Sequence, residues 1–243
     1  MTTLTKDGRV AYTRPSFALA VAAGAWLVTA GLLLWTDDGA GADRTGPGWF
    51  WMLGELERQL LALAFVAVPL TAGALVAARW AGRGAIGRVL GIRPWRWSDA
   101  LVGVAIALVV RAAVEVVEPT TGTLGGPFGA PPVVVAVSVL GAVVVAPVVE
   151  EVFFRGVMLR ALVDALAGWG RVVAAVIAVA VSTAAFVVLH LVTLGPFAPA
   201  GLLVGTIGIG VGCGVLAVVT GRIGGALVAH VVFNALGILL IVL

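Results

Sequence analysis

Two adjacent carboxylates and an arginine stand in one of the most apolar parts of this 243-residue sequence. Glu150 and Glu151 are followed by Arg155, whereas residues 132–149 contain no charged side chain. An ionisable group at the centre of a bilayer costs about 3 to more than 10 kcal/mol, so such groups usually face a cavity and serve a function. We therefore predict that this stretch is the chemical centre of the protein, with a carboxylate available as a base.

The two glutamates are expected to have different roles. Neighbouring residues on an α-helix point about 100° apart. Glu151 and Arg155 are separated by four positions, so they can pair on one helix face. Glu150 then points elsewhere, towards a cavity, where a carboxylate without a cation partner can accept a proton.

Both histidines of the chain lie in otherwise apolar segments, and each has a polar residue within reach. His230 precedes Asn234 by four positions, which places them on the same helix face. A turn near Gly170 lies about 20 positions after Glu150 and about 20 before His190, so an antiparallel helix pair would hold these two at the same depth. We expect Glu150, His190, His230 and Asn234 to share one site.

The composition is that of a membrane protein. Hydrophobic residues make up 61% of the chain and charged residues 11%, with a mean hydropathy of +1.15, whereas soluble domains carry about 25% charged residues. The net charge of +3 comes from arginines in short loops, a pattern typical of membrane proteins, so we expect no nucleic-acid partner. The single cysteine, Cys213, excludes an intrachain disulfide.

The sequence predicts an all-α fold, a polytopic transmembrane helix bundle with about seven spans (six to eight). Residues 1–130 should supply the N-terminal transmembrane helices and loops, and residues 131–243 the core that holds the site, within one integrated membrane domain. Pro147 should kink the fourth span. The expected spans are residues 16–35, 60–78, 100–117, 133–166, 172–194, 198–219, and 222–243. In the third, Arg111 and Glu115 are interpreted as an interfacial or interhelical pair.

Charged loops predict the orientation. The cytoplasmic side attracts basic loops, which places the N-terminus and residues 79–97 in the cytoplasm of a multi-pass cell-membrane protein. The basic residues are Lys6, Arg9, Arg14, Arg79, Arg83, Arg88, Arg93 and Arg96, and Asp37, Asp38 and Asp43 stand in the first outer loop.

Two distances disagree about which side gives access to the site. His230 follows Arg222, at the cytoplasmic start of the last helix, by about 12 Å of helical rise, which favours the cytoplasmic half. The roughly 20 residues between Gly170 and Glu150 span about 30 Å in a straight helix, which favours the opposite half. We expect access from the cytoplasmic half.

Three motifs resemble those of the CAAX prenyl protease and bacteriocin-processing (CPBP, or Abi) family of intramembrane proteases. They are EEVFFRG at Glu150–Gly156, FVVLH at Phe186–His190 and HVVFN at His230–Asn234. These match the family's Glu-Glu-x-x-x-Arg, Phe-x-x-x-His and His-x-x-x-Asn, in the same order and on successive helices. The resemblance covers roughly residues 133–240.

The resemblance implies an intramembrane endopeptidase. Glu150 and His190 would activate a water molecule, while His230 and Asn234 would stabilise the oxyanion of the tetrahedral intermediate. Glu151, Arg155 and Phe186 would support this arrangement. The partners would be the lipid bilayer and a membrane-associated peptide or protein substrate, with a lipidated substrate as one option.

A metal-dependent mechanism is the alternative for the same residues. Glu150, His190 and His230 have the composition of a catalytic zinc site, so they are the candidate ligands of a Zn²⁺ cofactor. The chain lacks a His-Glu-x-x-His helix, and we favour the metal-independent mechanism.

Two other classes of function compete with the protease. A proton-coupled membrane transporter could use the same residues as a relay, but carriers usually contain internal repeats, and no repeat is visible here. A non-catalytic membrane immunity or chaperone protein could keep the scaffold, but it would not need the complete polar set.

Overall fold

The computed structural model describes residues 11–36, 48–94, 96–121, 129–192 and 198–242. Part of the expected orientation rests on residues outside this set, namely Lys6, Arg9, Asp37, Asp38 and Asp43.

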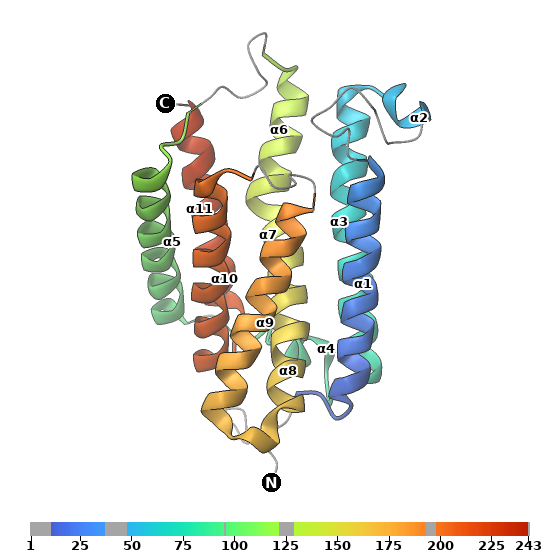
Figure 1. Cartoon of the computed structure of the whole chain (residues 1–243), viewed down its shortest axis with the longest axis vertical. Coiled ribbons are helices and arrows are strands. Elements are labelled where there is room, and N and C mark those ends of the chain that lie inside the picture. The colour runs from blue at the N-terminus through green and yellow to red at the C-terminus, as the bar shows by residue number, and fades with distance from the viewer. Residues whose placement is uncertain (1–10, 37–47, 95, 122–128, 193–197, 243) are drawn as a thin grey trace.

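Seven long apolar helices of the described chain lie along one another in a bundle (Figure 1). Each is long and apolar enough to cross a membrane, which confirms the predicted all-α architecture. Their bounds agree with the predicted spans to within a few residues. They are α1 (Pro15–Thr36), α3 (Glu55–Trp80), α5 (Trp97–Val117), the continuous helix Pro132–Ala165, α9 (Arg171–Leu191), α10 (Ala200–Thr220) and α11 (Gly224–Val242).

Short helices and turns connect the long ones. They are α2 (Gly48–Trp51), α4 (Ile86–Val89) and the 3₁₀ turn η3 (Ala167–Trp169). Gly221 ends α10 with φ +67°, a left-handed conformation that glycine adopts without steric cost, so α11 can turn straight back along α10. Gly170, directly before α9, also has a positive φ, at +91°.

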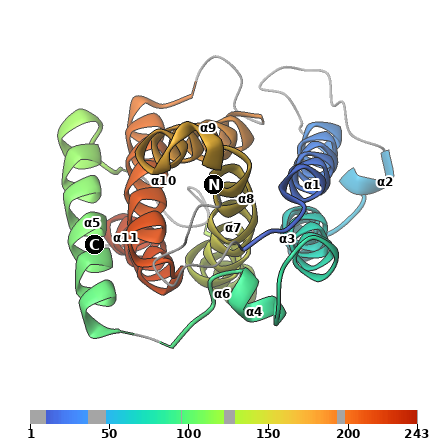
Figure 2. The same ribbon diagram turned by 90° about the horizontal axis from the view of Figure 1, so that it is seen from below.

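The helix Pro132–Ala165 occupies the middle of the bundle. Viewed along the helices, α1 and α3 pair at one edge, while α5 stands at the other edge beside α10 and α11 (Figure 2). The central helix contacts α3 and α1 on one side and α9, α10 and α11 on the other. It can therefore carry side chains into a site formed with the last three helices.

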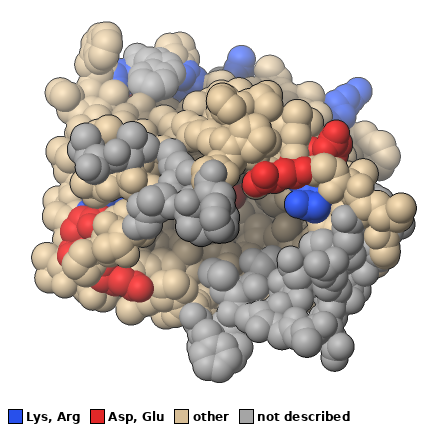
Figure 3. Space-filling model, turned by 90° about the horizontal axis from the view of Figure 1, so that it is seen from above, with Lys and Arg blue, Asp and Glu red and all other residues tan. Residues whose placement is uncertain are grey.

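The two ends of the bundle differ in their charged side chains. The connections at the lower end of Figure 1 contain Arg83, Arg88, Arg93, Arg96 and Arg222. The upper end carries Glu55, Glu57 and Glu118 next to the ends of α3 and α5. Seen from that end, acidic side chains gather at two places on the surface (Figure 3).

The central helix changes its hydrogen bonding twice. It consists of α6 (Pro132–Leu140), the π-helical segment η1 (Gly141–Val145), α7 (Ala146–Glu150), the π-helical segment η2 (Glu151–Met158) and α8 (Leu159–Ala165). Where we expected a kink at Pro147, π-helical turns stand on both sides of the residue. Proline has no N–H to donate and its ring crowds the carbonyl four residues earlier, and the wider π turn leaves room for both changes.

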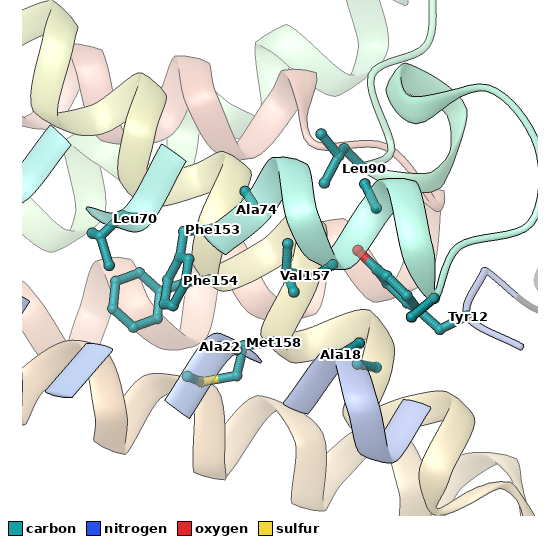
Figure 4. Packing of buried hydrophobic residues seen from close by; sticks show 14 of the residues in the cluster. Tyr12, Ala18, Ala22, Leu70, Ala74, Leu90, Phe153, Phe154, Val157 and Met158 are labelled. Carbon is teal, nitrogen blue, oxygen red and sulfur yellow. The ribbon is translucent and has the colours of Figure 1, made fainter. Parts of the chain in front are cut away.

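Small residues let η2 pack closely against α1 and α3. Phe153, Phe154 and Val157 are fully buried and meet alanines of the two helices, among them Ala22 and Ala74 (Figure 4). Helices in a membrane gain little from the hydrophobic effect between them, so close van der Waals packing is the main attraction. The segment that carries the glutamates is thus held firmly from behind.

The N-terminal segment is fastened to the far end of the same helix. The Tyr12 hydroxyl donates to the Gly156 carbonyl at 3.1 Å, and an Asp164 carboxylate oxygen accepts from the backbone N–H groups of Ala11 and Tyr12 at 3.0 and 2.8 Å. Burial raises the pKa of the Tyr12 hydroxyl, so it keeps its proton and remains a donor. Residues 11 and 12 therefore brace the end of η2.

Candidate active site

Four ionisable side chains form a buried chain of contacts across the bundle. Arg155 Nη1 lies 3.0 Å from Glu151 Oε1, as the i,i+4 spacing predicts, and the same oxygen lies 2.9 Å from His230 Nδ1. The other ring nitrogen, Nε2, lies 3.6 Å from Glu150 Oε2. One imidazole from α11 therefore stands between two carboxylates of the central helix.

This arrangement differs from the expectation that Glu150 points away from Glu151 and has no cationic neighbour. The difference arises at the junction of α7 and η2, where Glu150 ends the α-helical segment and Glu151 begins the π-helical one. The 100° rule holds for regular α-helix, and the wider turn of a π-helix changes the direction of successive side chains. Both carboxylates therefore reach the same histidine.

Arg155 is enclosed by protein. Its side chain is 1% exposed, its Nη2 donates to the Gly210 carbonyl of α10 at 3.1 Å, and its guanidinium stands 4.9 Å from the centre of the Phe186 ring. Its Nε makes no hydrogen bond. A charge in this position depends on Glu151 for compensation, because the side chain is enclosed by protein and has lost its solvation.

His190 stands on the other side of Phe186. Its Nδ1 lies 2.9 Å from the Phe186 carbonyl, which can only accept, so Nδ1 carries the hydrogen and Nε2 keeps its lone pair in the neutral ring. The Phe186 ring lies 4.4 Å from the His190 ring and 5.6 Å from the His230 ring, centre to centre. Among the contacts of the described residues, there is no direct hydrogen bond or ion pair between His190 and Glu150.

Asn234 lies one helical turn after His230 and reaches the central helix. Its Nδ2 donates to the Ala142 carbonyl, in η1, at 2.8 Å. An amide nitrogen carries two hydrogens, so this bond leaves a second donor. The contact ties α11 to the π-helical segment that precedes the glutamates.

A cavity of about 610 Å³ lies in front of these side chains. Its wall is largely apolar, with a few polar groups that converge from α5, α9, α10 and α11. The polar and charged lining residues are Arg111, Glu118, Thr120, Thr121, His190, Thr206, His230 and Asn234. Size, apolar walls and convergent polar groups are typical of a ligand site.

The structure brings three of the four predicted site residues into the cavity wall, namely His190, His230 and Asn234, together with Phe186. Glu150 lies one contact behind the wall, against His230, and is 6% exposed. Glu151 and Arg155 lie deeper still, at 0% and 1% exposure.

The cavity lining includes residues from the connections at the upper end of the bundle. Glu118 to Thr121 follow α5, and Pro199 precedes α10. This end is opposite the turn at Arg222, which begins α11. The lining thus extends towards the end opposite the one from which we expected access, as the distance of Glu150 from the Gly170 turn suggested.

The described residues contain no group of three or more His, Cys, Asp or Glu side chains arranged to hold a metal ion. The candidate set of Glu150, His190 and His230 therefore contains one close pair, Glu150 with His230, and a separate His190.

Sequence reasoning missed the contribution of α5 and of the α5–α6 connection. Arg111 and Glu118 line the cavity although they lie far from the three motifs. The pairing of Arg111 with Glu115 was expected and is present at 3.4 Å, but a spacing of four residues does not show which helix face turns towards a cavity.

These features define a polytopic membrane protein with a polar, partly charged site enclosed between its helices. Residues 132–236 match the family model described as type II CAAX prenyl endopeptidase Rce1-like. The chain thus carries a domain of the Rce1-like CPBP family, which implies an intramembrane protease. Comparisons with curated proteins and with solved structures gave no match.

Proposed function

We propose that the protein hydrolyses a peptide bond near the end of a membrane-associated peptide, with Glu150 and His190 activating water and His230 and Asn234 stabilising the oxyanion. The observation that carries this proposal is the convergence of His190, His230 and Asn234 on one cavity, with Glu150 directly behind His230. A hydrolase needs a base within reach of water and a donor for the developing negative charge, and the proposal assigns these roles to side chains on the cavity wall and directly behind it.

In the proposed reaction, a water molecule held between Glu150 and the His190 Nε2 lone pair gives a proton to Glu150. Its oxygen adds to the carbonyl carbon of the substrate, and the carbonyl oxygen becomes an oxyanion. His230 and Asn234 donate hydrogen bonds to that oxyanion. The intermediate then collapses, the C–N bond breaks, and the proton on Glu150 passes to the leaving nitrogen, which yields a carboxylic acid and an amine.

Glu151 and Arg155 are proposed to hold the donor in place. The bond from His230 Nδ1 to Glu151 fixes the ring, so that Nε2 faces Glu150 and the reaction site. The Arg155 guanidinium offsets the charge of the Glu151 carboxylate, and a paired charge is the form that a low-dielectric interior tolerates best.

The cavity wall favours a substrate with an apolar part. Val114, Leu202, Phe233, Ile238 and Ile241 line it together with the polar groups. An acyl or prenyl chain attached next to the scissile bond would be buried against such a wall at about 0.8 kcal/mol per CH₂ group. We therefore propose a lipidated peptide as the preferred substrate.

The proposal is tested by incubating the purified protein in lipid vesicles with an internally quenched peptide that carries a farnesylated cysteine. The same peptide without the lipid serves as the comparison. We expect cleavage on the carboxyl side of the lipidated residue, identified by mass spectrometry, and faster turnover of the lipidated peptide. A parallel sample with a zinc chelator shows whether turnover needs a metal. Failure to cleave either peptide would contradict the proposal.

Asn234→Ala should fold normally and turn substrate over about 10²–10³-fold more slowly, because an oxyanion donor acts on the transition state. Ser182→Ala is the matched control. Its hydroxyl likewise donates to a backbone carbonyl of the central helix, that of Phe154 at 3.1 Å, but it does not line the cavity. The measurement is kcat together with the melting temperature of both variants. Equal losses of kcat in the two variants would assign Asn234 a packing role.

The proposed orientation places the basic lower end in the cytoplasm, so the cavity opens on the outer side. Cys213 is fully buried and gives no background label. A membrane-impermeant maleimide applied to intact cells should therefore label Thr121→Cys, at the cavity mouth, and leave Arg83→Cys unlabelled until the membrane is opened. Both positions are exposed. The reverse pattern would place the mouth in the cytoplasm.

A further inference from the structure

Arg111 is a charged wall residue that the three motifs do not include. It belongs to α5, outside the family match at residues 132–236, yet it lines the same cavity as His190, His230 and Asn234. Among the lining residues that the structure describes, it is the only lysine or arginine. It therefore brings the one permanent positive charge of this wall to the site.

The guanidinium is held firmly against α11. Its Nη2 donates to the Phe233 carbonyl at 3.0 Å, and its central carbon stands 4.1 Å from the centre of the Phe233 ring. It also passes over Gly237, where a Cβ atom would come within 2.5 Å of Nη2. The glycine leaves the space that lets an arginine of α5 reach this position.

Glu115 contacts Arg111 and Glu118 lines the same cavity, and both direct their carboxylates mainly towards other groups. Glu115 accepts from the backbone N–H and the hydroxyl of Thr120 at 2.7 and 2.6 Å, and its contact with Arg111 is longer, at 3.4 Å. Glu118 accepts from the Gly201 N–H at 2.7 Å, at the start of α10. Arg111 Nε makes no hydrogen bond.

A structural arginine of the same chain looks different. Arg222 binds Asp99 through two parallel bonds, Nε to Oδ2 at 2.6 Å and Nη2 to Oδ1 at 3.0 Å. Such a fork satisfies both partners. Arg111 has no comparable partner among the described residues, although it stands on a cavity wall, so it retains capacity for an incoming carboxylate.

The position of Arg111 relative to the proposed scissile bond limits how many substrate residues can lie between them. Gly237, beside its guanidinium, follows His230 by seven residues and Asn234 by three, or about 10 Å and about 4.5 Å of helical rise. An extended peptide covers about 3.3 Å per residue, so about one to three residues fit between Arg111 and the two proposed oxyanion donors. Building on the proposed function, we propose that Arg111 binds a substrate carboxylate that lies up to about three residues beyond the scissile bond.

A carboxylate at that place has two sources, the C-terminus of a short leaving peptide or an acidic side chain. The test uses three farnesylated, internally quenched peptides that differ only beyond the scissile bond. One ends three residues on with a free carboxylate, one ends there as a carboxamide, and one is the carboxamide with aspartate as the third residue. Each is measured with the wild type, Arg111→Gln, Arg111→Lys and Arg58→Gln.

Wild type should cleave the free carboxylate peptide about 10- to 100-fold more efficiently than the carboxamide, the ratio that a charge-assisted hydrogen bond supplies. Arg111→Gln should remove this preference and keep the carboxamide rate, which shows that the variant is folded and active. Arg111→Lys should retain part of it. Arg58→Gln makes the same change at the same end of the bundle, away from the cavity, and should keep the full preference.

Equal losses for all three peptides in Arg111→Gln, or a preference that survives the substitution, would overturn the inference. Recovery of cleavage by the aspartate peptide would assign the site to acidic side chains as well as to C-termini. If the wild type cleaves no peptide, the proposed function fails on its own. The inference is then decided by thermal shift with the free and amidated tripeptides: selective stabilisation of the wild type by the free acid supports it, and equal shifts overturn it.

Discussion

Glu150→Gln should reduce peptide cleavage by about 10²–10⁴-fold, the usual effect of losing a general base, while the helix bundle stays folded. Glutamine keeps the size of the side chain and cannot accept the proton of the attacking water. The Glu151–Arg155 ion pair and the bond from His230 to Glu151 do not involve Glu150, so they remain in place. The measurement is kcat/KM on the lipidated peptide together with the melting temperature in detergent.

Glu55→Gln is the matched control for this variant. It is the same carboxylate-to-amide change on an exposed residue at the start of α3, away from the cavity, and both rate and melting temperature should match wild type. An active Glu150→Gln variant would remove Glu150 from the reaction.

Glu151→Gln should destabilise the fold, because it leaves Arg155 charged and buried. Both side chains are almost completely enclosed, at 0% and 1% exposure. Breaking a buried ion pair from one side costs about 3–5 kcal/mol. We expect low yield and early melting, measured by thermal unfolding and by the fraction that elutes as a single species.

A double variant separates the stranded charge from other causes. Glu151→Leu with Arg155→Met removes both charges, and replacing a buried pair with apolar side chains is often neutral or stabilising. This variant should melt near the wild-type temperature and remain inactive, since His230 loses its anchor. A double variant as unstable as Glu151→Gln would show that the bond to His230, rather than the charge of Arg155, holds the fold. If Glu150→Gln is the unstable variant and Glu151→Gln the stable, inactive one, the two proposed roles are exchanged.

Hydropathy was sufficient to predict the helices. A span of about 20 apolar residues has few alternatives in a bilayer, since its backbone groups must bond within the segment. Glycine and proline then marked the ends, as at Gly170 and Gly221, so the seven spans appear close to their predicted bounds. The three motifs brought His190, His230 and Asn234 together because they lie on helices that pack around the central one.

The directions of the side chains in the site depend on structural features that leave no pattern in the nearby sequence. The directions of Glu150 and Glu151 were predicted from regular α-helical geometry, but the helix becomes π-helical at Glu151. That change depends on how residues 151–158 pack against neighbouring helices. The spacing of residues along the chain does not reveal this packing. The contribution of Arg111 likewise depends on which face of α5 meets α11, and Gly237, the residue that makes room for it, lies 126 positions away.

The bonds from Ala11 and Tyr12 to Asp164 and Gly156 constrain the order in which the protein assembles. These partners are 144 to 153 positions apart in the chain. A ribosome makes the N-terminal segment first, so the donors of residues 11 and 12 lack these acceptors until the central helix has been synthesised and inserted. The same segment also bonds to the end of α3, where the Ala11 carbonyl accepts from the Arg83 N–H at 3.0 Å and the Thr13 N–H donates to the Ala81 carbonyl at 2.9 Å. The N-terminal segment can therefore dock on α3 first and close onto the central helix later.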